Sequence, residues 1–267
     1  MPAESDRDEA LRTEIAQLGE LLGQTVKDAA GEQSLQVVES IRCAARDRRG
    51  GDDDAEHRLQ EKLANLDNVQ LRVVIRAFSI LLDLANLAED RQRLRVLQQR
   101  ERDDFPEPRR ESIRRALLDM KAAGKTDHQI QNLVDALRIE LVFTAHPTEA
   151  KRRSARHKLR RIRNLLDDLD QRRLPTDVDH GWQLIRAEMM KLWLTDFIRP
   201  WRPTVLQEVQ RGLSIKPVLW DVAPQMLSEL RSAITQSYEG RDFHVRPCLT
   251  FGSWIGGDRD GHPYVTA

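Results

Sequence analysis

The sequence predicts a mainly α-helical protein. Apolar residues recur at three- and four-residue spacings along most of the 267 residues, as they do on one face of a helix. Charged residues make up 32% of the chain and aromatic residues only 5%, a composition typical of helix-rich proteins with polar surfaces. Two segments, 141–144 and 243–251, have the apolar, β-prone character of strands. The length allows one large domain or two small ones.

The N-terminal half is predicted to consist of successive helices. Apolar stripes with helical spacing begin at Leu11, Leu35 and Leu59. The segment 69–97 is apolar around more than half its circumference, which predicts a central helix. The prolines of segment 105–108 end that helix, because proline lacks the N–H group that a helix interior needs.

Two capping boxes predict later helix starts. Thr126 is followed three residues later by Gln129, and Thr204 by Gln207, so each pair can satisfy the first N–H groups of a helix. The helix that starts after Thr204 is expected to extend to about Trp220.

Three further boundaries are inferred from glycine and proline. Segment 174–181 is predicted to be a loop, followed by a helix over 182–197. Pro224 suits the first turn of one more helix, which would end near Gly240.

The chemically most informative segment is 141–149, with the sequence LVFTAHPTE. A residue that precedes proline is restricted towards extended geometry, so we expect His146 at the carboxyl end of a strand. Strand ends of this kind carry the reacting groups of α/β barrels, and the following helix start offers N–H groups to an anion. An imidazole there could exchange a proton near neutral pH. The residues alone leave open a turn histidine that bonds only to backbone.

A strongly basic helix follows this histidine. Residues 151–163 contain eight lysines or arginines and no acid. The helix is expected to pack through its apolar stripe of Ala155, Leu159, Ile162, Leu166 and Leu169. Only Arg152 and Arg153, in its first turn, are placed to bind an anion together with His146. For the remaining charges a solvated or subunit-contacting face is favoured over a nucleic-acid stripe, since the chain has 43 basic and 43 acidic residues.

The second candidate site segment is the glycine-rich loop 256–261. Glycine lets a backbone approach a ligand closely, and Arg259 could form paired hydrogen bonds with a carboxylate or phosphate. A tight turn with an internal ion pair between Arg259 and one of its neighbouring aspartates is the alternative. No spacing of histidines or cysteines indicates a metal site in this chain.

Several motifs together resemble the phosphoenolpyruvate carboxylase family. The two long ones are TAHPTE over 144–149 with Arg152-Arg153, and FGSWIGGDRDG over 251–261. Shorter segments similar to the family's N-terminal helical region are Arg76-Ala77-Phe78, Leu84-Ala85-Asn86-Leu87-Ala88-Glu89, Leu192-Trp193, Thr195-Asp196 and Arg202-Pro203-Thr204. They occur in family order between about residue 70 and residue 266.

The resemblance implies a mostly helical protein wrapped around a (β/α)8-type barrel. Residues 1–138 would form the N-terminal helical region, and 139–267 the start of the catalytic barrel, incomplete in this chain. The implied reaction converts phosphoenolpyruvate and bicarbonate to oxaloacetate and phosphate through carboxyphosphate and enolpyruvate. His146 matches the histidine thought to take the carboxyphosphate proton.

The resemblance also implies a substrate-binding set. Trp254 matches a tryptophan credited with lining the carbon dioxide pocket. Gly256, Gly257 and Asp258 belong to the same loop, and we infer that Arg152, Arg153 and Arg259 supply positive charge around the anions. One departure is His262, which stands where many members carry asparagine.

The remaining expectations also follow from the family. Magnesium or manganese is implied as cofactor, with ligands outside this chain, and a homo-oligomer, commonly a tetramer, as the assembly. We expect a lyase of central carbon metabolism, linked to the tricarboxylic acid cycle. From the residues themselves we expect a cytoplasmic protein that does not bind a membrane, since no apolar run approaches about 18 residues and the acidic N-terminus lacks a signal-peptide pattern. No nucleic acid is expected as a partner, since the 43 basic and 43 acidic residues balance.

The chain is expected to be a truncated, inactive part of a longer enzyme. Two alternatives are a regulatory or partner-binding helical module and an anion- or nucleic-acid-binding module. Neither accounts for both strand-end motifs.

Overall fold

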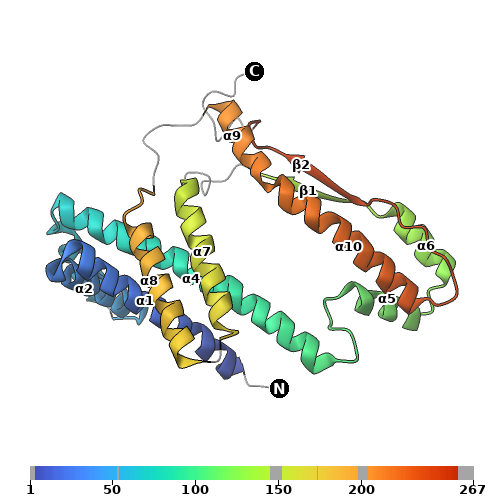
Figure 1. The fold of residues 1–267 in the computed structure, drawn as a ribbon, viewed down its shortest axis with the longest axis horizontal. Coiled ribbons are helices and arrows are strands. Elements are labelled where there is room, and N and C mark those ends of the chain that lie inside the picture. Colours follow the sequence, from blue (N-terminus) through green and yellow to red (C-terminus); the bar gives the residue numbers. More distant parts are fainter. Residues whose placement is uncertain (1–3, 53, 145–151, 173, 198–203, 258–267) are drawn as a thin grey trace. The chain divides into compact units, whose positions relative to one another are not determined.

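The computed structural model describes residues 4–52, 54–144, 152–172, 174–197 and 204–257, with the side chains of residues 4–8 left aside. These residues are mostly helical, which confirms the predicted mainly α character (Figure 1). The helices are α1 (Glu4–Ala30), α2 (Glu32–Arg49), α3 (Ala55–Ala64), α4 (Asn68–Asp104), α5 (Ile113–Ala122), α6 (Asp127–Ala136), α7 (Arg153–Leu169), α8 (Pro175–Trp193), α9 (Val205–Gly212), the 3-10 turn η2 (Leu213–Ile215) and α10 (Lys216–Ser237). The strands are β1 (Ile139–Phe143) and β2 (Leu249–Ser253). A (β/α)8-type barrel stays a prediction.

The chain divides into two compact units. Unit 1 comprises residues 1–96 and 151–199, and unit 2 comprises residues 97–150 and 200–267. Helix α4 contributes to both, because the division falls within it. The predicted boundary between residues 138 and 139 stays a prediction about the longer protein.

Unit 1 is a helical bundle with one apolar core. The core takes side chains from α1, α2, α4, α7 and α8, among them Leu18, Ile80, Ile162, Ile185 and Met189, which are fully buried. The apolar stripe predicted for the basic helix lies in this core, with Ala155, Ile162 and Leu166 buried and Leu159 and Leu169 partly buried against it. Burial of this stripe fixes α7 in the bundle.

A buried group of charges joins three elements of unit 1. The guanidinium of Arg91, on α4, is only 2% exposed and donates to Glu14 of α1 at 2.5 Å, Asp167 of α7 at 2.8 Å and Asp170 at 2.9 Å. Arg95 donates to Glu14 at 2.5 Å and lies 3.3 Å from Asp170. Burial by itself would lower the pKa of Arg91, but the hydrogen bond to Asp167 and the charge of Glu14 outweigh it, and the pKa is raised.

Unit 2 combines helices with a two-stranded sheet. Its core is formed by side chains of α5, α6, α10 and the segment after α10, among them Leu117, Ile130, Val134, Ile234 and Phe243. Strands β1 and β2 pair in parallel, with Ile139 opposite Leu249 and Phe143 opposite Ser253. Over the described residues these two strands are the whole sheet.

The predicted loop over 174–181 was wrong. Pro175 is in the first turn of α8, where its missing N–H costs nothing, and helix continues through Gly181. A Cβ at Gly181 would lie 2.5 Å from the Leu169 side chain, so glycine here permits close packing of α8 on α7 and does not break the helix. The helix ends at Trp193, four residues before the predicted Phe197.

The predicted course after Thr204 was partly wrong. Both capping boxes are confirmed, with Thr126 capping α6 and Thr204 capping α9. However, α9 ends at Gly212, and Pro224 lies inside α10, whose early proline is Pro217. A helix can carry an interior proline on an exposed face at the cost of one backbone hydrogen bond.

The second strand is shorter than the predicted 243–251. Phe243 and Val245 are buried in the unit 2 core, and the backbone of His244 is bonded by the Gln131 side chain in both directions, at 3.1 and 2.9 Å. Because these contacts take the place of strand hydrogen bonds, β2 begins only at Leu249.

Candidate functional site

The two candidate site segments follow neighbouring parallel strands. Phe143 and Ser253 face each other in the register, so β1 and β2 end at the same edge of the sheet. The N–H of Trp254 donates to the carbonyl oxygen of Phe143 at 2.7 Å, and the Phe143 and Phe251 rings stack with centroids 6.2 Å apart. The segments that begin at Thr144 and Trp254 therefore leave the sheet side by side.

Three of the predicted site residues, His146, Asp258 and Arg259, lie outside the described residues. Of the first motif the structure describes Thr144, and of the second it describes the residues up to Gly257. The roles of these three residues stay predictions.

The turn after β2 is built against α9. Gly257 donates its N–H to the Trp254 carbonyl at 2.9 Å, and Gly256 has a φ of +80°, which favours glycine. A Cβ at Gly256 would lie 2.3 Å from a methyl group of Val209, and one at Gly212 would lie 2.7 Å from Ile255. Close packing on α9 thus explains Gly256 locally, and the turn leaves Trp254 58% exposed.

Arg152 and Arg153 stand at the start of α7, in unit 1. Arg152 is the N-cap residue, and its backbone N–H donates to the Phe197 carbonyl at 3.2 Å. Its guanidinium lies 3.7 Å from the carboxylate of Asp196, whereas Arg153 is exposed. Trp254, Gly256 and Gly257 belong to unit 2, so the convergence of all predicted site residues on one pocket stays a prediction.

The rest of the basic helix is partly paired within unit 1. Arg161 lies 3.1 Å from the buried Glu188 of α8, and Arg163 lies 4.0 Å from Asp167. Arg156, His157 and Arg160 are exposed. This arrangement agrees with the favoured interpretation of a solvated face.

The sequence did not assign a role to Arg76 or Asp196. Arg76 donates to the Trp193 carbonyl at 2.9 Å and to Asp196 at 3.3 Å, and its guanidinium lies 5.8 Å from the centroid of the Trp193 ring. Arg76 and Asp196 are 120 positions apart in the chain, so no local pattern could have linked them.

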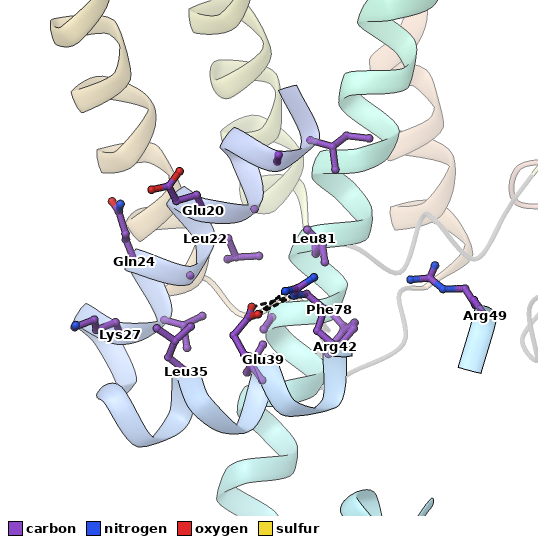
Figure 2. A pocket seen from close by; sticks show the side chains of 17 residues that line it. Glu20, Leu22, Gln24, Lys27, Leu35, Glu39, Arg42, Arg49, Phe78 and Leu81 are labelled. Carbon is purple, nitrogen blue, oxygen red and sulfur yellow. Dashed lines mark hydrogen bonds and ion pairs between the residues drawn. The ribbon is translucent and has the colours of Figure 1, made fainter. Parts of the chain in front are cut away.

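A cavity of about 660 Å³ lies between α1, α2 and α4 (Figure 2). Its lining includes the apolar Leu22, Phe78 and Leu81 and also Glu39, whose carboxylate accepts hydrogen bonds from Arg42 at 2.7 to 3.1 Å. Of the predicted site residues that the structure describes, none lines this cavity.

The described residues offer no metal site of their own. Over these ranges there is no group of three or more histidine, cysteine, aspartate or glutamate side chains that could hold a metal ion. The predicted magnesium or manganese, with ligands outside this chain, stays a prediction. In the same ranges, no helix has the length and apolar character needed to cross a membrane.

These features define the class of the protein: a mainly helical chain with candidate anion-binding segments at the ends of two parallel strands. A family model described as phosphoenolpyruvate carboxylase matches residues 11–267. The chain therefore belongs to the phosphoenolpyruvate carboxylase family.

Curated relatives agree with this assignment. The chain is 40% identical over 266 residues to the phosphoenolpyruvate carboxylase of Roseiflexus castenholzii, covering 97% of this chain and 28% of the relative. It is 35% identical to the enzyme of a Thermus species and 37% identical to that of Escherichia coli O81, covering 98% and 97% of this chain and 29% of each relative. The chain thus spans less than a third of the length of these relatives.

Proposed function

We propose that this chain forms the N-terminal part of a phosphoenolpyruvate carboxylase. The whole enzyme would convert phosphoenolpyruvate and bicarbonate to oxaloacetate and phosphate. The observation that supports the proposal is the parallel pairing of β1 and β2, because the two strands that lead into the family motifs end at the same edge of a sheet. Groups that follow neighbouring strand ends can act on the same bound substrate.

The reaction would proceed in three steps. A bicarbonate oxygen attacks the phosphorus of phosphoenolpyruvate, and the bond to the enolate oxygen breaks, giving carboxyphosphate and enolpyruvate. Carboxyphosphate then loses its carboxyl proton and splits into carbon dioxide and phosphate. The methylene carbon of the enolate attacks carbon dioxide and forms oxaloacetate.

His146 would accept the proton of carboxyphosphate, as an imidazole can near neutral pH. Trp254 would line an apolar pocket that keeps carbon dioxide beside the enolate. The side chain is 58% exposed and directly follows β2, so a large apolar surface is available at this edge. Gly256, Gly257 and Asp258 would shape the turn around the substrate.

Arg152, Arg153 and Arg259 would hold the anions. Phosphoenolpyruvate and bicarbonate both carry negative charge and repel each other, so fixed guanidinium groups lower the free energy of their encounter. Arg152 and Arg153 also lie where the N-terminal N–H groups of α7 favour an anion.

Further features are proposed from family membership. Magnesium or manganese would bind to ligands outside this chain, a homo-tetramer would be the assembly, and the enzyme would work in the cytoplasm.

The test is His146→Asn in the full-length enzyme. Oxaloacetate formation should fall on the order of 100-fold or more, as expected when a general base is lost. Bicarbonate-dependent release of phosphate should persist, since carboxyphosphate still forms without His146 and water can hydrolyse it to bicarbonate and phosphate. Oxaloacetate and phosphate are measured in parallel assays.

His157→Asn is the matched control, since His157 is an exposed histidine on α7. The 267-residue chain alone, given both substrates and magnesium, should form no oxaloacetate. Undiminished oxaloacetate from the His146 variant would refute its role, and turnover by the chain alone would refute its incompleteness.

A further inference from the structure

Three charged side chains connect three elements of unit 1 at the start of α7. Asp196, which follows α8, lies between Arg76 of α4 and Arg152 at the N-cap of α7. Its Oδ1 accepts from Arg76 at 3.3 Å, and its Oδ2 lies 3.7 Å from the Arg152 guanidinium. We call these three residues the clamp.

The clamp is anchored in the core by Arg76. The same guanidinium that bonds Asp196 also donates to the Trp193 carbonyl at 2.9 Å and lies over the Trp193 ring. Trp193 is only 5% exposed and belongs to the core of unit 1. The position of Asp196 is therefore set by the packed end of α8. Arg76 uses two different nitrogens for the two bonds, and a lysine has only one nitrogen to place between these acceptors.

The backbone of Arg152 is held from the same direction. Its N–H donates to Phe197, the residue after Asp196, at 3.2 Å. The Arg152 carbonyl in turn accepts from the N–H groups of Ala155 and Arg156, at 3.1 and 3.3 Å, in the first turn of α7. Both the side chain and the backbone of Arg152 thus depend on the segment that contains Asp196.

The net charge of the clamp is positive, which favours the binding of an anion. Asp196 alone would cancel the charge of Arg152, but Arg76 adds a second positive charge, so the three side chains sum to +1. The side chains of Arg76, Arg152 and Asp196 are 34%, 33% and 65% exposed. Ion pairs so exposed contribute little to folding stability, so the clamp serves to orient Arg152 more than to stabilise the unit.

We propose that Asp196, held by Arg76, is a positioning residue that orients Arg152 for the substrate anion. Asp196 does not touch substrate in this proposal, and it acts through Arg152 alone. The inference depends on the proposed function for the identity of that anion, phosphoenolpyruvate.

The test is Asp196→Ala in the full-length enzyme, with Arg76→Ala, Arg76→Lys and the double alanine variant. Each single alanine variant should raise KM for phosphoenolpyruvate roughly tenfold, because Arg152 is no longer held in the orientation that binds the anion; about 100-fold is the order expected for a full misplacement of about 1 Å. The thermal midpoint should stay close to that of the wild type. Arg76→Lys should not restore KM, and the double variant should be no worse than either single one, since each change breaks the same bridge.

The matched control is Arg186→Ala. Arg186 makes a similarly exposed ion pair with Asp28, at 2.7 Å, on another part of α8. This variant should leave KM unchanged. Equal effects of the Arg186 and Asp196 changes on KM would overturn the positioning role.

A second readout does not depend on activity. Hydrogen exchange at the amides of Ala155 and Arg156 should accelerate at least severalfold in Asp196→Ala and not in Arg186→Ala. If the wild-type enzyme makes no oxaloacetate, the proposed function fails, and the exchange rates still decide whether the clamp holds the start of α7. Unchanged exchange in Asp196→Ala would overturn the clamp whatever the activity.

Discussion

Unit 1 and unit 2 differ in how they bury apolar side chains. Over the described residues, twenty buried apolar side chains form one core in unit 1, whereas eight form the core of unit 2. Unit 2 leaves large side chains exposed on α9 and α10, with Leu206 at 74% and Trp220 at 82%. Burial of apolar surface is the main stabilising contribution to folding. The comparison indicates that unit 1 is the more stable body, and that the strand-end motifs lie in the less buried one.

The largest expected effect concerns the ion pairs that Arg91 makes with carboxylates of unit 1. Arg91→Ala should reduce the free energy of unfolding by about 3 kcal/mol, because it removes one of the two arginines that lie 2.5 Å from the buried carboxylate of Glu14 and leaves only Arg95. The measurement is urea unfolding of the 267-residue chain. Arg42→Ala, which breaks an exposed pair with Glu39, is the control and should cost at most about 1 kcal/mol. Equal losses would show that the Arg91 group contributes no more than a surface pair.

A smaller effect compares the two cores directly. Ile162 of unit 1 and Ile234 of unit 2 are both fully buried. Replacement by alanine should cost about 4 kcal/mol at Ile162 and about 2 kcal/mol at Ile234, since the smaller cluster can relax around the lost side chain. Urea unfolding of both variants gives the two values. A greater loss at Ile234 would reverse the ranking of the units.

The smallest effect concerns pH and unit 2. The hydrogen bond from Arg241, at 2.8 Å, and that from the backbone of His128 lower the pKa of Asp127 below its usual 3.8. Because the pKa of Asp127 is lower in the folded than in the unfolded chain, ionised Asp127 stabilises unit 2 at pH values above the unfolded pKa. This contribution to the free energy of unfolding is lost as the pH falls through the folded pKa. Asp127→Asn should therefore weaken the dependence of unfolding on pH between about 5 and 2.

Thermal unfolding at a series of pH values measures this dependence. Arg241→Gln should weaken the pH dependence of unfolding to a similar extent, because it removes the Arg241 guanidinium, whose hydrogen bond is the largest cause of the lowered pKa of Asp127. A pH profile unchanged in both variants would exclude a contribution from this ion pair.

The sequence predicted those features of the fold and site that depend on neighbours in the chain. The capping boxes at Thr126 and Thr204 are correct because the bonding groups stand three residues apart. The apolar stripe of α7 is correct because helical periodicity alone defines it. The loop predicted over 174–181 failed because Gly181 was interpreted as a helix breaker, when its role is packing against Leu169.

In the candidate site, too, features set by neighbouring residues were predicted and pairings between distant segments were not. Strands were predicted over 141–144 and 243–251, and the structure has strands that overlap these ranges, Ile139–Phe143 and Leu249–Ser253. The bond from Trp254 to Phe143 joins residues 111 positions apart, and nothing in either segment specifies the other as its partner. The clamp of Arg76, Asp196 and Arg152 was likewise beyond prediction.

The amino-acid sequence by itself determined most of the helical segments, the caps at Thr126 and Thr204, and which motifs relate the chain to its family. Tertiary structure alone decided that β1 lies beside β2, that Arg91 gathers carboxylates from α1 and the end of α7, and that Asp196 lies between two arginines. The reason is physical. Helices and caps are closed by hydrogen bonds over three or four residues, whereas these pairings depend on how the apolar cores bring distant segments together.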